Sequence, residues 1–192
     1  MEKEIITAVA LGIGLSASTG FRVFLPLLIA GIAGRLGFLP LTESFAWLSG
    51  NTALMALGVA TLVEVGAYYL PFVDNLLDTI STPLAIGAGT LISASVLPVD
   101  NELVRWITGF IVGGGAAAAV QGSTAALRLG SSSTTAGTGN VLVSTGENIL
   151  AVVTPIITII IPIIIAIIIL ILFFSIFRWV IQRKRKKATM AG

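Results

Sequence analysis

The stretch ILAVVTPIITIIIPIIIAIIILILFFSIFRWVI, residues 149–181, is the longest apolar run of the chain. Its 33 residues exceed the roughly 20 that a membrane-spanning helix needs, and they include Pro155 and Pro162. We therefore expect a membrane helix here that is tilted, kinked at a proline, or extended beyond the bilayer.

The composition of the rest of the chain agrees with this prediction. Hydrophobic residues make up 56% of the 192 residues and charged residues only 10%, against roughly 25% charged residues in a soluble domain. This excludes an ordinary soluble protein and a disordered one. Cysteine and histidine are both absent. Disulfides, zinc sites and Cys/His nucleophiles are therefore excluded, and we expect no enzyme activity, no metal and no cofactor.

Four further stretches predict membrane segments, namely residues 5–33, 52–70, 73–97 and 103–129. With residues 149–181 they predict an all-α polytopic membrane protein of four to six membrane segments. At least one of these should be broken or re-entrant. Residues 73–97 carry a polar first half, so they either span with that half buried against protein or form a broken or re-entrant helix.

Glycine, serine and threonine dominate residues 130–146. This composition is typical of a flexible surface loop. A re-entrant loop that lines a polar cavity is the alternative, because irregular backbone at membrane depth needs such shelter.

Basic residues are concentrated in the tail. Six of the eleven lie at or after Arg178, which leaves five basic and nine acidic residues, a net charge of −4, for residues 1–177. We therefore expect a single transmembrane domain over 1–177 and a basic tail over 178–192. The tail should be cytoplasmic and in contact with anionic lipid, with no nucleic-acid partner. The N-terminus is external if all five stretches cross, and internal if one is re-entrant.

Two groups of motifs recur in the same order along the chain. Ser18-Thr19 with Arg22 resembles Ser123-Thr124 with Arg128, and Asp74-Asn75 before Thr82-Pro83 resembles Glu147-Asn148 before Thr154-Pro155. Transporters often contain internal repeats, inverted ones among them. The pattern predicts a degenerate inverted repeat, and biased composition is the alternative explanation.

Charged residues fall inside or beside the apolar stretches, where each costs at least about 2.5 kcal/mol. They are Arg22, Glu64, Asp74, Asp78, Arg128 and Glu147. Asp74 and Asp78 are four residues apart, so on a helix they repel each other unless they share a proton or a cation. The arginines are natural counter-ions and also suit phosphate or carboxylate. Three interpretations stay open: a polar membrane site, a structural ion-pair cluster, or solvated interfacial acids.

Two longer motifs carry a family resemblance. They are LSASTGFRVFLPLL at residues 15–28 and EVGAYYLPFVDNLLDTISTP at residues 64–83. Together with Gln121-Gly122-Ser123-Thr124 and Ser144-Thr145-Gly146-Glu147, they make residues 5–175 resemble the bacterial membrane family catalogued as domain of unknown function number 4126. The resemblance implies a small multi-pass protein of the bacterial cytoplasmic (inner) membrane, without an established activity. The recurring polar positions map onto Arg22, Glu64, Tyr68, Asp74, Asn75, Asp78, Gln121, Asn140 and Glu147.

The leading functional prediction is a small transporter or channel-like protein for an ion or small anionic solute. Its pathway would use Arg22, Glu64, Asp74, Asn75, Asp78, Arg128, Asn140 and Glu147. The alternative is a non-catalytic membrane scaffold that binds lipid or a partner, and an enzyme acting on a lipid phosphate is the least favoured. Expected partners are membrane lipids, the transported ion or solute, and a second copy of the chain, for which the glycine-rich residues 109–115 offer a close-packing face.

Overall fold

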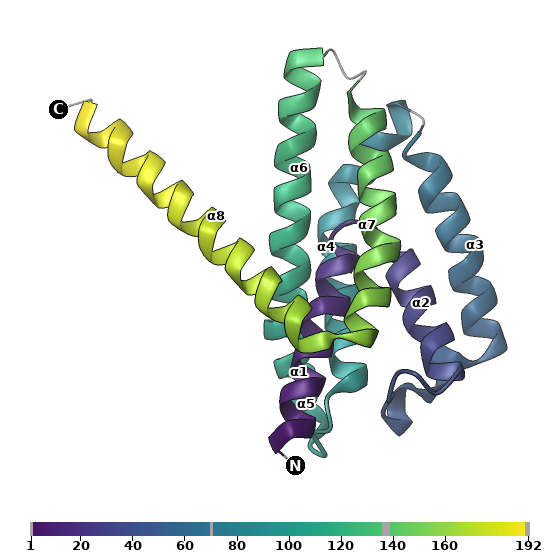
Figure 1. Cartoon of the computed structure of the whole chain (residues 1–192). Helices are drawn as coiled ribbons and strands as arrows, with labels where there is room; N and C mark the ends of the chain where they lie inside the picture. Colours follow the sequence, from purple (N-terminus) through teal and green to yellow (C-terminus); the bar gives the residue numbers. More distant parts are fainter. Residues whose placement is uncertain (1, 70, 136–138, 191–192) are drawn as a thin grey trace.

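The computed structural model describes residues 2–69, 71–135 and 139–190, without the side chains of 71–79, 176–177, 179–181 and 183–190. All regular secondary structure among these residues is helical, with no strand, which confirms the all-α prediction (Figure 1). The elements are α1 (Glu2–Thr19), α2 (Phe24–Arg35), the 3-10 helix η1 (Glu43–Ser49), α3 (Asn51–Ala67), α4 (Pro71–Val96), α5 (Glu102–Gly109), the π-helix η2 (Phe110–Gly114), α6 (Gly115–Thr135), α7 (Asn140–Ile160) and α8 (Pro162–Met190).

The predicted segment 5–33 is broken into two helices. Helix α1 ends at Thr19, and α2 runs back toward the end of the molecule where α1 begins (Figure 1). The turn between them, residues 20–23, packs against α6: a Cβ on Gly20 would lie 2.7 Å from the carbonyl oxygen of Ala117. Only glycine permits this approach. Pro26 sits in the first turn of α2, where a missing amide proton costs no helical hydrogen bond.

Helix α4 is continuous over 71–96, with Pro83 inside it. Of the alternatives for residues 73–97, the unbroken helix is therefore the one observed. Helices α1 and α6 run in the same direction, and so do α4 and α7 (Figure 1). The two halves that carry the recurring motifs thus have parallel rather than inverted orientations.

By length and composition, two helical stretches can cross a membrane, Glu102–Thr135 and Asn140–Ile160. A third candidate is the pair η1 and α3, bent by 58° at Gly50, which is a broken element of the predicted kind. Three shorter apolar helices are present in addition, over Phe24–Arg35, Ile80–Val96 and Pro162–Ser175.

The prediction of a loop over 130–146 is wrong for most of its described residues. Helix α6 continues to Thr135, and α7 begins at Asn140. Hydroxyl groups bond back to carbonyl oxygens within the last turns of α6, for example Thr134 to Gly130 at 2.9 Å and Thr135 to Ser131 at 2.7 Å. These bonds satisfy the hydroxyl groups without ending the helix.

The apolar run 149–181 is divided at its second proline. Pro155 stays inside α7, whereas Ile161 leaves the helical conformation at φ −135° and Pro162 opens α8. A proline has no amide proton and fits the first position of a helix. Figure 1 shows α8 leaving the other helices at a wide angle.

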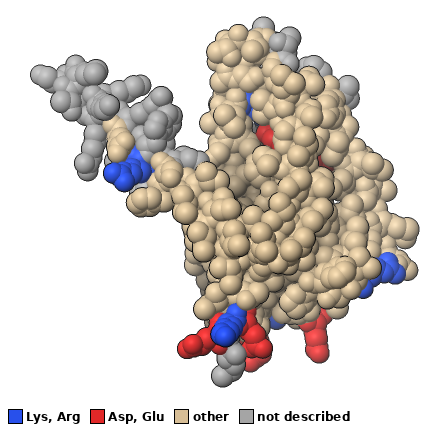
Figure 2. All heavy atoms as spheres, in the orientation of Figure 1, with Lys and Arg blue, Asp and Glu red and all other residues tan. Residues whose placement is uncertain are grey.

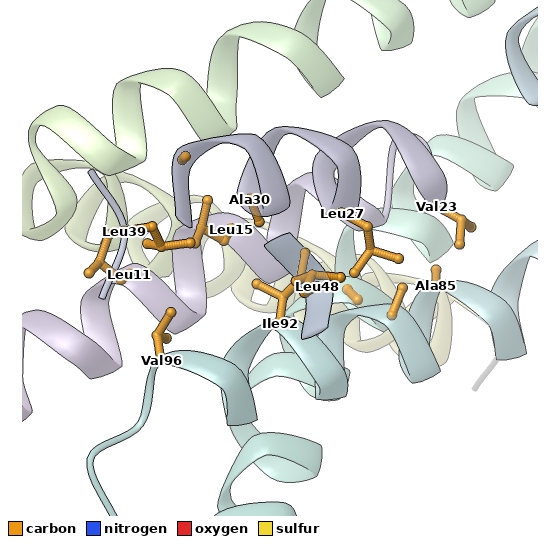
Figure 3. Packing of buried hydrophobic residues seen from close by; sticks show 13 residues of the cluster. Leu11, Leu15, Val23, Leu27, Ala30, Leu39, Leu48, Ala85, Ile92 and Val96 are labelled. Atoms are coloured by element: carbon orange, nitrogen blue, oxygen red, sulfur yellow. The ribbon is translucent and has the colours of Figure 1, made fainter. Parts of the chain in front are cut away.

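Small residues bring α1, α4 and η2 together. The Ser16 hydroxyl donates to the Gly89 carbonyl oxygen at 2.7 Å, and a Cβ on Gly113 would collide with that same oxygen. Close backbone approach of this kind drives helix association in lipid. Beside it lies the apolar core between α1, α2, η1 and α4, which includes Leu15, Leu48 and Ile92 (Figure 3).

Charged atoms are distributed unevenly over the surface. Figure 2 shows red and blue atoms gathered at the end where α1 begins. Toward the opposite end of this face, only small recessed areas of basic and acidic atoms are visible among neutral ones. Among the described side chains of α1 to α7, those of Arg22, Glu64, Arg105, Arg128 and Glu147 are buried.

Candidate functional site

The turn between α1 and α2 buries Arg22, whose side chain extends to α7. Arg22 is 1% exposed. Its Nε donates to Asn148 Oδ1 at 2.6 Å, its Nη1 to Glu147 Oε2 at 2.8 Å, and its Nη2 to the Ser144 carbonyl oxygen at 3.2 Å. A further bond from Nη1 reaches the Phe21 carbonyl oxygen at 3.0 Å. The planar guanidinium therefore fixes the turn against one face of α7.

Glu147 is shared between two arginines from different elements. Arg128 of α6 donates from Nε to Glu147 Oε1 at 3.0 Å, and its Nη2 forms an ion pair with Oε2. The Arg128 bonds have the two-point geometry of an arginine–carboxylate pair. All three side chains are buried. A single carboxylate thus links α7 to α6 and to the α1–α2 turn.

Both guanidinium groups lie over the ring of Tyr68, at the end of α3. The Arg22 Cζ is 3.8 Å from the ring centroid and the Arg128 Cζ is 4.4 Å from it. Cation–π attraction strengthens when the partners are desolvated, and Tyr68 is buried. The ring therefore stabilises two like charges held close together.

Glu64, one turn before Tyr68 on α3, binds the start of α2. Its Oε1 accepts from the Val23 amide at 2.6 Å and its Oε2 from the Phe24 amide at 3.0 Å. The first amides of a helix have no partner within the helix, and their positive partial charge attracts anions. Glu64 is thus a built-in anion on the α2 N-terminus.

A cavity of about 260 Å³ lies between α2, α3 and α4, immediately beside this cluster. Most of its lining is apolar, and its polar members are Glu64, Tyr68 and Ser81. The Ser81 hydroxyl also accepts a hydrogen bond from Gln121 Nε2 at 2.7 Å, which joins α4 to α6. The cavity is large enough for water or a small solute.

The structure brings together four of the predicted pathway residues: Arg22, Arg128 and Glu147 in direct contact, and Glu64 beside them. Asp74, Asn75 and Asp78 lie in the first half of α4, and their side chains are outside the described ones. No described contact tests their role.

Asn140 does not join the cluster. It opens α7, two turns or about 10 Å before Glu147, and its Nδ2 donates to Ser132 Oγ at 2.9 Å. In the described structure it links the ends of α6 and α7, and its assignment to the pathway stays a prediction. Polarity within an apolar stretch does not reveal which turn of a helix meets a neighbour.

Two participants were missed in the prediction of pathway residues. Asn148 accepts from Arg22 and donates from Nδ2 to the Tyr69 hydroxyl at 3.2 Å, although it appeared only as part of a repeated motif. Tyr68 entered through the family resemblance alone. Its cation–π role depends on helix packing and leaves no signal in the sequence spacing. Among the described residues, no three acidic side chains gather as a metal site would require.

The apolar helices identify the chain as an α-helical membrane protein, with a buried charge cluster at a helix break. The model of a family described as a domain of unknown function (DUF4126) matches residues 9–183, and the chain therefore belongs to this family. The match confirms the resemblance and extends into the beginning of the basic tail. No curated protein matches the chain, and no solved structure does.

Proposed function

We propose that this protein transports an ion or a small anionic solute across the bacterial cytoplasmic membrane, as a carrier or a channel. One observation carries the proposal: the buried charges meet at the break between α1 and α2, next to the cavity lined by Glu64, Tyr68 and Ser81. Many membrane transporters build their substrate site at the ends of discontinuous helices near the middle of the membrane.

The energetic cost of the cluster supports a functional role. Each charge at membrane depth costs at least about 2.5 kcal/mol, and apolar side chains of similar volume would hold helices together without that cost. The same chain packs α1, α4 and η2 through glycine, serine and apolar side chains. Cohesion therefore does not require the charged residues.

Glu64 has the most direct part in this proposal. It occupies the α2 N-terminus, where a solute carboxylate or phosphate would find two amides. The Glu64 carboxylate would leave the two amides when an anion from the cavity binds there and return to them when the anion leaves, so the cycle requires a charged Glu64. Asp74, Asn75 and Asp78, on the neighbouring helix, are assigned to the same pathway from the sequence.

The expected orientation follows from the tail. Its basic residues favour a cytoplasmic C-terminus, where we expect them to contact anionic lipid. Helices α1 and α8 begin near one end of the bundle and rise from it (Figure 1). We therefore expect the two termini on opposite sides of the membrane.

The test is flux through the purified full chain in liposomes. Dyes for membrane potential and internal pH report movement of protons, Na⁺, chloride and phosphate down imposed gradients. We expect flux for at least one of these, and its loss in Glu64→Gln, which keeps the size of the side chain. Arg35→Gln, a charge removal at an exposed site, is the matched control. Wild-type vesicles that are tight to all four ions, or full flux in Glu64→Gln, would remove the proposal.

A membrane scaffold is the second candidate, because one observation favours it. Every nitrogen of the Arg22 guanidinium already has a hydrogen-bond partner within the protein, as expected for an arginine with a structural role. A scaffold predicts tight liposomes together with a lipid or protein that co-purifies in fixed ratio. Flux in the same preparation would decide against it.

A further inference from the structure

Arg105, in the first turn of α5, is a buried cation far from the Arg22 cluster along the chain. It is 8% exposed. It follows the α4–α5 connection, at the end of the body where Figure 2 shows the surface charges and where α1 begins (Figure 1). The proposed transport function does not use this residue.

The guanidinium of Arg105 has few partners for a buried charge. Its Nη2 donates to Ser44 Oγ at 3.1 Å. Within the described part of the chain, no carboxylate forms an ion pair with it, and its buried Nε has no hydrogen-bond partner. Arg22, by contrast, uses all three nitrogens. A buried cation without an anion is costly, so its position needs a compensating group.

Aromatic side chains hold this guanidinium in place. Its Cζ lies 5.6 Å from the centroid of the Phe45 ring, which is buried in η1. Phe45 in turn packs against Trp106 with ring centroids 5.5 Å apart. The arginine is thus oriented before any ligand arrives, which lowers the entropic cost of binding.

Nearby hydroxyl groups favour an anion with several acceptor oxygens. Glu43 and Glu102, the acids next to this site in sequence, are exposed and make no ion pair with Arg105. The Thr42 hydroxyl, in the same turn as Ser44, is also buried without a partner. An arginine fork and adjacent hydroxyl donors match the oxygens of a phosphate group.

The depth of the site points to the membrane interface. Trp47 and Phe38, on either side of this turn in the sequence, are both largely exposed, as aromatic residues at the headgroup level are. We propose that Arg105, with Ser44, binds the phosphate group of an anion at this rim of the protein, either a phospholipid headgroup or free phosphate.

Binding to the full chain in detergent tests this proposal. The protein is stripped of lipid, and phosphatidylglycerol, diacylglycerol without a phosphate, or inorganic phosphate is added, with occupancy read by native mass spectrometry. We expect phosphatidylglycerol to bind the wild type and diacylglycerol not to bind. Arg105→Gln should weaken binding by about tenfold or more, because a charge-assisted hydrogen-bond pair is lost. Arg35→Gln, an exposed arginine at the same end, should bind as the wild type does.

Two further arms complete the design. Competition by inorganic phosphate would identify the phosphate alone as the ligand, whereas its failure to compete would identify the intact headgroup; both support the site. Ser44→Ala keeps the arginine and should weaken binding by a smaller factor, which protects the test if Arg105→Gln does not fold. No binding by the wild type, or equal binding in Arg105→Gln and the wild type, would overturn the proposal.

Discussion

The replacement Arg22→Gln perturbs the centre of the buried cluster. It removes the guanidinium that makes four hydrogen bonds, to Asn148, Glu147, Ser144 and Phe21. Glutamine is too short to reach all of these partners and carries no charge. Glu147 stays buried and keeps Arg128 as its ion-pair partner. The variant therefore loses one cation but does not leave a carboxylate unpaired.

The magnitude can be bounded from two sides. Hydrogen bonds in membrane proteins average about 0.6 kcal/mol each, so four bonds give about 2.4 kcal/mol. Removal of one partner of a buried ion pair costs about 3–5 kcal/mol, and the remaining Arg128 contact places this case at the lower limit. We expect the free energy of unfolding to fall by about 3 kcal/mol.

The assay is reversible unfolding of the purified chain in detergent, followed by circular dichroism. Arg35→Gln, an exposed site, should stay within about 0.5 kcal/mol of the wild type. A cycle with Glu147→Gln and the double variant should give a coupling energy of at least about 1 kcal/mol. A loss below about 1 kcal/mol for Arg22→Gln, or additive effects in the cycle, would refute the account of a shared carboxylate.

Three other replacements probe separate contacts. Gly113→Ala should destabilise the chain by about 1–3 kcal/mol, because a Cβ at this position would meet the carbonyl oxygen of Gly89. The control Gly115→Ala, with nothing within 4 Å of its Cβ, should be neutral or slightly stabilising. Equal effects of the two replacements in thermal unfolding would contradict the observed packing. Tyr68→Leu should cost about 1–2 kcal/mol through two cation–π contacts, and unchanged stability would exclude their contribution. Glu64→Gln should raise amide hydrogen exchange at Val23 about tenfold, and unaltered exchange would show that the carboxylate does not hold α2.

Local rules succeeded where the signal is a single strong residue. A kink at a proline was expected within residues 149–181, and Pro162 begins α8 after Ile161. They failed where hydroxyl-rich sequence was taken as loop, because serine and threonine bond back within the turn and leave α6 intact to Thr135. Pro83 is a second example: a proline inside a helix usually kinks or breaks it, but α4 continues through this one.

The candidate site was predicted in part for a comparable reason. Charges in apolar stretches must find partners, so Arg22, Arg128 and Glu147 could be expected to meet. The sequence could not predict which of these residues pair, because 125 positions separate Arg22 from Glu147 along the chain. Asn140 has the same local character as Asn148, yet only Asn148 faces Arg22.

The sequence by itself determined the class of protein. A chain with 56% hydrophobic and 10% charged residues cannot cover a soluble surface, and backbone polar groups in an apolar environment require helices. Tertiary structure alone decided which charges pair, because ion pairs and cation–π contacts depend on the rotation and offset of packed helices. It placed Glu64 on the amides of α2 and, among the residues that the structure describes, gave Arg105 no carboxylate; both proposals depend on those placements.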